Sequence, residues 1–199
     1  QKSQKKICYS FYNAFQVPAN HVTPSYIAHG DKRFICVGAL KNLNKNGLVA
    51  VESFADSSKY MNGWSLELFG TNNYQNALKH LLLKKNCSSV FDNGAEQNLS
   101  NVYSTAYALL IPSFEEGLPN VVVEAFSYGV PCIGFRDCPG VNELIIDGKN
   151  GFLVDRVEPD GFKKAIQQIA VLSVRNELSK GAFAFAEENF SFNEWTTKW

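Results

Sequence analysis

Two glutamates in this sequence, eight positions apart, frame the segment with the most evident chemistry. Glu116 and Glu124 enclose the residues Gly-Leu-Pro-Asn-Val-Val-Val. If a helix begins within this segment, its first backbone N–H groups form the positive end at which an anion binds. The spacing then predicts two carboxylates on either side of a phosphate cradle. The alternative is that Glu116 is only a solvated charge on a loop and that Glu124 only interacts with the helix dipole.

Whether a helix begins there depends on the flanking strands. Val121–Val123 favour a strand by composition. However, apolar runs at 109–111 and 133–135 read as strands, and the gap between them suits a helical crossover. We therefore predict a helix from Pro119 or Asn120 to Tyr128.

The start of this helix defines the anion site. Asn120 suits an N-cap, or Pro119 the first helical position, so that residues 117–120 present free backbone N–H groups. Glu116 then lies on the loop above the sheet, and Glu124 lies about one turn into the helix. Both carboxylates are expected at the same crevice.

Strand-like and helix-like segments alternate along the chain, and this alternation predicts the fold class. Such alternation is typical of an α/β fold with a doubly wound parallel sheet, Rossmann-like, in which ligands bind at the carboxyl ends of the strands. The expected strands are 34–38, 65–70, 89–93, 107–112, 131–135 and 151–154, and the expected helices are 47–61, 74–85, 99–104, 119–128, 141–146 and further helices from 159 onward.

Composition narrows the class of protein. The 199 residues suit one domain, and the formal net charge of +0 provides no general attraction to nucleic acid or to an acidic membrane surface. Five cysteines occur without a C-x-x-C pair, which favours reduced thiols and a cytoplasmic location. Because an initiator methionine is rarely removed before glutamine, the first residue, Gln1, indicates a fragment of a longer protein.

Several other enzyme classes lack their motifs in this sequence. There is no G-x-G-x-x-G, no P-loop and no cluster of His and Cys ligands, which argues against a dinucleotide dehydrogenase, a P-loop enzyme and a structural zinc module. There is no D-x-D either, which fits a transferase that uses no metal. Ser127 lies in an A-x-S-x-G pattern, but late in the expected helix and after all three histidines, which disfavours a serine hydrolase. Asp147 begins a calcium-like loop that lacks the ligand pattern of such a loop.

The segment EGLPNVVVEAF and the following G-V-P resemble the E-x7-E signature of the retaining family 4 glycosyltransferases, which have the GT-B fold. The segments at 34–40 with Lys45, at 66–70, at 139–143 and at 147–154 are similar to further elements of that family. The resemblance covers residues 33–199. It implies a domain that binds a nucleotide sugar, preceded by a linker over 1–32, and an absent N-terminal domain for the acceptor.

The resemblance also implies a role for each matched residue. Glu124 would accept hydrogen bonds from the ribose hydroxyls, Glu116 would contact the donor sugar, and Lys45 would neutralise the leaving diphosphate. The remaining residues expected to bind the donor are Gly38, Gly117, Leu118, Pro119 and Asn120. No cofactor is implied beyond a donor substrate linked to UDP or GDP.

One departure from the family pattern keeps alternatives open. Many members carry an arginine where this sequence has Ala39, and Lys41 or Arg136 is a candidate substitute. A non-catalytic nucleotide-binding module of the same fold therefore remains as an alternative. A GT-B sugar-nucleotide epimerase is a further alternative, which the complete E-x7-E signature disfavours. The family's commonest context is synthesis of a surface polysaccharide or glycolipid. It implies a glycan or lipid-linked acceptor and is compatible with peripheral association of the full-length protein with the inner face of the cytoplasmic membrane.

Overall fold

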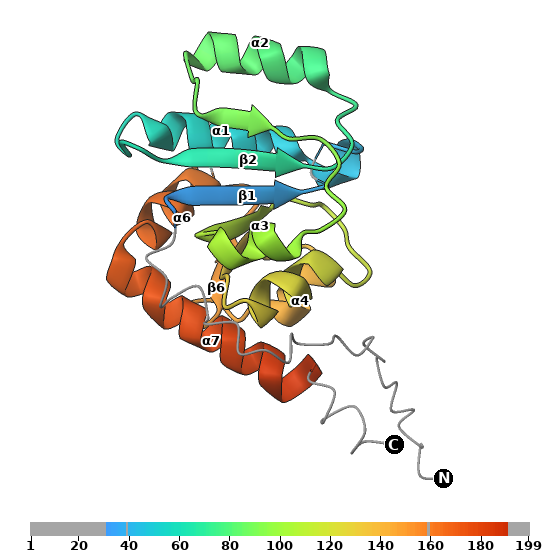
Figure 1. Cartoon of the computed structure of the whole chain (residues 1–199), viewed down its shortest axis with the longest axis vertical. Helices are drawn as coiled ribbons and strands as arrows, with labels where there is room; N and C mark the ends of the chain where they lie inside the picture. The colour runs from blue at the N-terminus through green and yellow to red at the C-terminus, as the bar shows by residue number, and fades with distance from the viewer. Residues whose placement is uncertain (1–30, 39, 159, 191–199) are drawn as a thin grey trace.

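A six-stranded, wholly parallel sheet forms the centre of the protein (Figure 1). The computed structural model describes residues 31–38, 40–158 and 160–190. The strand order is β3-β2-β1-β4-β5-β6. The strands are β1 (Arg33–Val37), β2 (Ser65–Phe69), β3 (Val90–Asp92), β4 (Ala108–Ile111), β5 (Cys132–Phe135) and β6 (Gly151–Val154).

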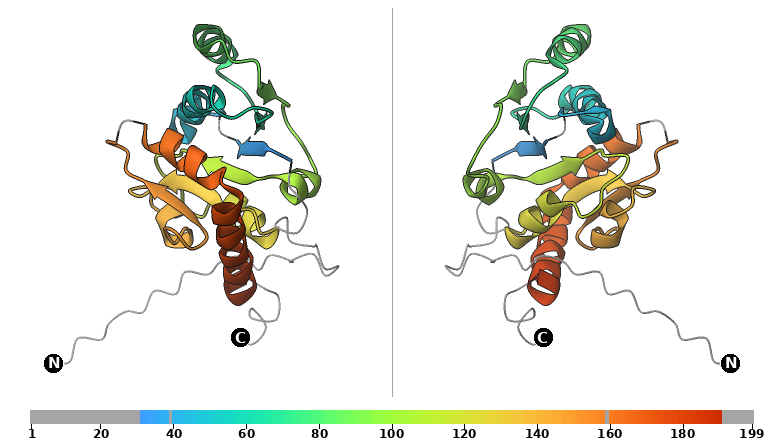
Figure 2. Two further views of the ribbon diagram at one scale, coloured as in Figure 1. Left: turned by 90° about the vertical axis from the view of Figure 1, so that its left-hand side faces the viewer. Right: turned by 90° about the vertical axis from the view of Figure 1, so that its right-hand side faces the viewer.

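Helices cover both faces of the sheet, as Figure 2 shows with α1 and α6 on one face and α3 and α4 on the other. Within the described ranges, none of them is long and apolar enough to cross a membrane. The helices are η1 (Leu43–Lys45), α1 (Gly47–Ser58), α2 (Gln75–Lys85), α3 (Ser100–Thr105), α4 (Asn120–Ser127), α5 (Val141–Leu144), α6 (Gly161–Ile169) and α7 (Leu172–Phe190).

The order of the strands reverses between β1 and β4. The chain first builds outward from β1 to β2 and β3, then returns to place β4 on the other side of β1, where Phe34 pairs with Ala108 and Ile35 with Leu109. In an open parallel sheet, the crevice at such a reversal is where ligands bind. The predicted fold class, a doubly wound α/β sheet, is confirmed.

Burial on both faces explains why the central strands read as continuous apolar runs. Every residue of β4 and β5 is buried. On β1, the Phe34 ring is fully buried and stacks on Trp64 with ring centroids 5.1 Å apart. Trp64 also meets Tyr107 edge-on at 4.6 Å, so this partly buried tryptophan packs against the core.

The segment at 120–127 is a helix despite its three consecutive valines. In α4, Val122 and Val123 are buried while Val121 is only partly covered. The helix packs against α7 and β5, so its apolar face is held by tertiary contacts that outweigh strand propensity. The crossover helix is confirmed.

The structure corrects one sequence expectation and leaves another untested. The helix expected over 47–61 ends at Ser58, because Tyr60 and Met61 donate their N–H groups to Ser57 and Ser58 in tighter, three-residue turns. The linker expected over 1–32 lies almost entirely outside the described residues, as does Ala39. The expectation of a linker therefore stays a prediction.

Candidate functional site

Three loops meet at the carboxyl edge of the sheet, and they carry most of the residues that the sequence indicates. They follow β1, β4 and β5. Phe114 in the second loop donates its N–H to the Asn44 carbonyl in the first at 2.8 Å. Glu116 donates its N–H to the Pro139 carbonyl in the third at 3.3 Å. The loops thus form one connected surface beside the point where the strand order reverses.

Lys45 ends the short 3-10 turn η1, and asparagines hold the backbone on both sides of it. The Asn42 side chain accepts a hydrogen bond from the Lys45 N–H at 3.1 Å. Asn46 follows in the left-handed region with φ 48°, a conformation that asparagine tolerates better than most residues, and its N–H returns to the Leu43 carbonyl at 3.1 Å. The position of Lys45 is therefore set by local backbone geometry.

Lys45 and Glu116 form an ion pair across the reversal point. The Lys45 Nζ lies 2.6 Å from the Glu116 Oε1, and the two side chains are 28% and 11% exposed. Partial burial weakens solvent screening, so this contact is stronger than a typical surface pair. The two groups expected to act on the donor sugar and on its diphosphate are adjacent.

Asn44 joins the same two loops through its own side chain and backbone. Its Nδ2 donates to the Glu115 carbonyl at 2.7 Å, while its carbonyl accepts the Phe114 N–H. These two hydrogen bonds flank the ion pair. They hold the backbone of the loop after β1 against that of the loop after β4.

Gly140, in the loop after β5, packs against the backbone of the loop that carries Glu116. Its φ of 76° lies in the left-handed region, and a Cβ built there would come within 2.6 Å of the Gly117 carbonyl oxygen and 2.7 Å of that of Glu116. Only glycine combines this conformation with such close backbone contact. Gly140 therefore lets the loop that carries Glu116 pack directly against the backbone of the loop after β5.

The start of α4 differs from the sequence expectation. Pro119 is the N-cap and Asn120 the first helical residue, and no side chain caps the helix. The predictions of Asn120 as N-cap and of Pro119 at the first helical position are therefore wrong. Proline has no N–H, and the Asn120 N–H donates to the Leu118 carbonyl at 2.9 Å. Within the described residues, Gly117 and Leu118 keep backbone N–H groups that donate to no acceptor.

Glu124 is held by Tyr103, which no sequence motif indicates. The Tyr103 hydroxyl, from α3, donates a hydrogen bond to the Glu124 Oε2 at 2.7 Å. Burial, together with the neighbouring carboxylate charge, raises the pKa of Tyr103 far above its usual range, so the hydroxyl stays protonated. Among the described residues, nothing donates to the Glu124 Oε1. One carboxylate oxygen is thus anchored and the other is available.

A buried thiol lies close to the Glu116 carboxylate. Burial first, and then the charge of Glu116, raise the pKa of Cys138 to about 11. Cys138 is therefore a protonated thiol at neutral pH and not a nucleophile. Its Sγ donates to the Pro139 carbonyl at 3.5 Å, which adds one more contact within the loop after β5.

The remaining candidates for binding the donor, two cations and one glycine, differ in whether their groups are already engaged. Arg136 is bound to Asp147 at 2.7 Å and Asp155 at 3.2 Å, so its charge is already engaged. Lys41 is exposed. Gly38 has φ 68° and donates its N–H to Phe69 at 2.6 Å. A Cβ there would meet nothing within 4 Å, so the space beside it is open.

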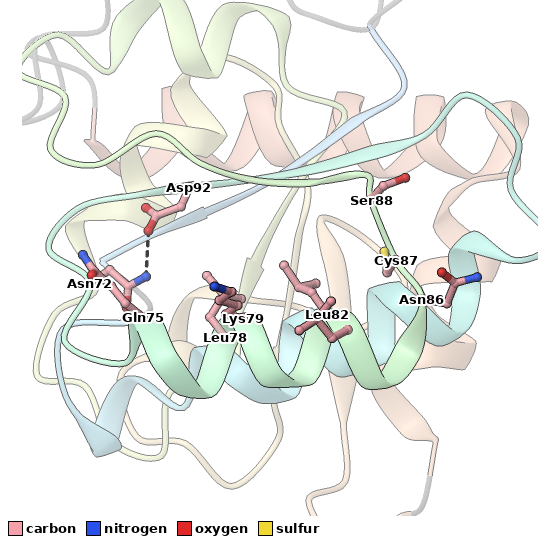
Figure 3. Close-up of a pocket in the computed structure, with 10 residues that line it drawn as sticks. Asn72, Gln75, Leu78, Lys79, Leu82, Asn86, Cys87, Ser88 and Asp92 are labelled. Atoms are coloured by element: carbon pink, nitrogen blue, oxygen red, sulfur yellow. Dashed lines mark hydrogen bonds between the residues drawn. The ribbon is translucent and has the colours of Figure 1, made fainter.

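A hollow of about 440 Å³ lies apart from these loops, between α2 and β3 (Figure 3). Leu78 and Leu82 point into it from α2, and Asn72 donates to Asp92 at its rim at 2.7 Å. Lys79 is the single cation among its lining residues. Because it shares no residue with the predicted site, we do not assign the donor to it.

Sequence reasoning missed Asn44 and Tyr103 as parts of the site. Asn44 lies in an asparagine-rich loop, which signals a turn but not its contact with a segment about 70 residues away. Tyr103 reads as an ordinary buried aromatic residue on a short helix.

A further arginine, Arg156, lies over the Phe114 ring at 4.6 Å and donates to the Phe114 carbonyl at 3.2 Å. Only the folded chain reveals these contacts.

We expect Gly140→Ala to destabilise the protein by about 2 kcal/mol or more, because strain and backbone overlap both act there. Gly148→Ala is the matched control, since Gly148 has φ 74° but a Cβ there would meet nothing within 4 Å. Urea unfolding of the two variants measures the difference. Equal losses of stability would show that Gly140 does not support the Glu116 loop sterically.

Known proteins share both the sequence pattern and the fold of this chain. The chain is 33% identical over 94 residues to an uncharacterized glycosyltransferase of Haemophilus influenzae, covering 47% of this chain and 27% of that protein. It is 25% identical to a UDP-N-acetylglucosamine–peptide N-acetylglucosaminyltransferase GtfA subunit of Limosilactobacillus reuteri, covering 72% of this chain and 28% of that one. The chain thus spans less than a third of these relatives.

A solved structure and a family model agree with these relatives. The pneumococcal O-GlcNAc transferase GtfA, solved in complex with UDP and GlcNAc, superposes with a TM-score of 0.77 at 22% identity, over 86% of this chain and 35% of that one. This likeness establishes the fold. The sequence model of the family described as glycosyl transferases group 1 matches residues 31–171. The chain therefore belongs to the group 1 glycosyl transferases, and its parallel sheet is the Rossmann-like half of a GT-B fold.

Proposed function

We propose that this chain is the donor-binding domain of a retaining glycosyltransferase. It would bind a sugar linked to UDP or GDP and transfer that sugar to a glycan or lipid-linked acceptor. One observation carries the proposal, namely the 2.6 Å contact between Lys45 and Glu116 at the reversal of the strand order. This contact places a cation and a carboxylate where a Rossmann-like sheet binds its ligand.

The nucleoside is proposed to bind beside α4 through Glu124. The free Oε1 of this carboxylate would accept hydrogen bonds from the ribose hydroxyls, because a carboxylate has acceptor sites for two neighbouring hydroxyl groups. Tyr103 holds the other oxygen at 2.7 Å, so the carboxylate is oriented before the ligand arrives. Such orientation lowers the entropic cost of binding.

The diphosphate is proposed to lie between Lys45 and the N-terminus of α4. The Gly117 and Leu118 N–H groups donate to no described acceptor, and the positive end of the helix favours an anion there. Lys45 would neutralise the charge that develops on the diphosphate when the sugar–oxygen bond breaks and the electron pair moves to the phosphate oxygen. This interaction is strongest in the transition state, as catalysis requires.

Glu116 is proposed to orient the donor sugar through its hydroxyl groups. Its negative charge near the anomeric carbon would favour a transition state with oxocarbenium character. The acceptor is proposed to bind to a second, N-terminal domain. We place the full-length protein in the cytoplasm, with peripheral association at the inner face of the membrane, in keeping with the free thiols of Cys36, Cys87, Cys132 and Cys138.

We expect calorimetry with UDP and GDP to detect binding of one of them, and Glu124→Ala to weaken it roughly 10- to 100-fold, since hydrogen bonds to a charged group are lost. Lys45→Met should weaken the same ligand by roughly tenfold or more because its charge no longer faces the diphosphate. The matched controls are Glu115→Ala and Lys84→Ala, both exposed positions. Binding unaltered by either site substitution would refute the assigned site.

Tyr103→Phe is expected to weaken binding of the same nucleotide by roughly threefold, because Glu124 loses its anchor, and to lower stability by about 1 kcal/mol. Tyr107→Phe is a matched control, since the Tyr107 hydroxyl donates to the Ala170 carbonyl at 3.2 Å, away from the site. It should lower stability without changing nucleotide affinity. An equal loss of affinity in both variants would mean that Tyr103 acts only through stability.

Sugar transfer is tested in a protein that joins this chain to an acceptor-binding domain. Glu116→Ala should lower turnover by roughly 100-fold, the scale seen when one transition-state contact is removed. Glu115→Ala changes the charge equally on the neighbouring, exposed position and should leave turnover unchanged. Undiminished turnover in the Glu116 variant would remove this carboxylate from catalysis.

A further inference from the structure

Lys45 and Glu116, the two residues proposed to act on the diphosphate and on the sugar, pair with each other inside the proposed donor site. The two charges are 2.6 Å apart, and the Glu116 side chain is only 11% exposed. Among the described residues, no other cation pairs with Glu116 and no other carboxylate pairs with Lys45. A diphosphate that approaches Lys45 therefore meets an ammonium group that is already neutralised, with a negative charge beside it.

The loops that carry the pair cannot easily separate to relieve this competition. Asn44 binds the loop after β4 through two hydrogen bonds, at 2.7 and 2.8 Å, and Gly140 supports that loop from below. Glu116 can therefore leave Lys45 chiefly by moving its side chain. Such a movement is favourable only if other donors replace the ammonium group, since a partly buried carboxylate without a partner is costly.

Arg156, which donates to the Phe114 carbonyl in the loop after β4, already has a carboxylate partner. Arg156 pairs with Asp137 at 3.0 Å and lies over the Phe114 ring at 4.6 Å. The hydroxyl groups of a donor sugar would supply new hydrogen bonds to Glu116, whereas a nucleoside diphosphate without its sugar supplies none. The same carboxylate would therefore be satisfied by the intact donor and left unpaired by the product.

We infer that Glu116 determines selectivity for the intact nucleotide sugar over the nucleoside diphosphate that remains after transfer, by competing with that diphosphate for Lys45. With the sugar present, Glu116 binds the sugar and Lys45 binds the diphosphate. Once the sugar has left, Glu116 returns to Lys45 and weakens the hold on the product. This inference rests on the proposed donor site and adds to it a role in product release.

The test is the affinity of the chain for UDP or GDP, whichever the wild type binds, measured by calorimetry. Glu116→Gln should tighten binding by roughly fivefold, about 1 kcal/mol at 1.4 kcal/mol per tenfold change, because Lys45 becomes free and a like charge is removed. Glu116→Asp, with a carboxylate withdrawn from Lys45, should tighten it less. Binding of the nucleoside alone, uridine or guanosine, should not change.

Two controls separate this effect from a general change of charge. Glu115→Gln removes the same charge from the adjacent, exposed residue and should leave affinity unchanged. In a Lys45→Met background, Glu116→Gln should add little, because the competition runs through Lys45. Equal tightening by Glu115→Gln, or an undiminished gain without Lys45, would overturn the inference.

The outcomes also distinguish this inference from the proposed function. If the wild type binds a nucleoside diphosphate through Lys45 but Glu116→Gln binds it equally or more weakly, the competition is refuted and the donor site stands. If the wild type binds neither UDP nor GDP, both are refuted. Thermal unfolding of each variant confirms that a change in affinity reflects the site and not the fraction of folded protein.

Discussion

The adjacency of β1 and β4 is the constraint on which the rest of the site depends. The two strands pair directly although the chain forms β2 and β3 between them. Because parallel strands end at the same edge, the loops that follow them leave the sheet side by side. This arrangement brings Lys45 to within 2.6 Å of Glu116 from 71 positions away in the chain. No local feature of either loop could produce that contact.

The two glutamates of the opening motif have different surroundings, although both lie near the start of the same helix. Glu116 faces an ammonium group, while Glu124 accepts a hydrogen bond from the neutral Tyr103 hydroxyl. The first contact joins two opposite charges, whereas in the second a neutral donor orients a single carboxylate. The structure therefore gives one residue type two surroundings: an ammonium partner, Lys45, at position 116 and a neutral hydroxyl donor, Tyr103, at position 124.

The sequence was a good guide to elements whose cause is local. Apolar runs predicted the strands, and the gap between 111 and 133 predicted a helix where three valines favour a strand; α4 is that helix, with Val122 and Val123 buried. The cap was predicted wrongly, because the turn before α4 uses the Leu118 carbonyl to bind the Asn120 N–H. In that turn, the backbone N–H groups of Gly117 and Leu118 donate to no acceptor among the described residues. Gly140 packs closely against the start of that turn, since a Cβ there would come within 2.6 Å of the Gly117 carbonyl oxygen.

By itself, the sequence determined the alternation of strands and helices, the parallel sheet and the family resemblance of the E-x7-E segment. These follow from periodicity and from spacings of a few residues, which act through the local backbone. Only the tertiary structure decided which side chains meet: Lys45 with Glu116, Asn44 with the loop after β4, and Tyr103 with Glu124. Each of these contacts joins residues 21 or more positions apart. Their distances depend on strand order and packing, which residue spacing does not encode.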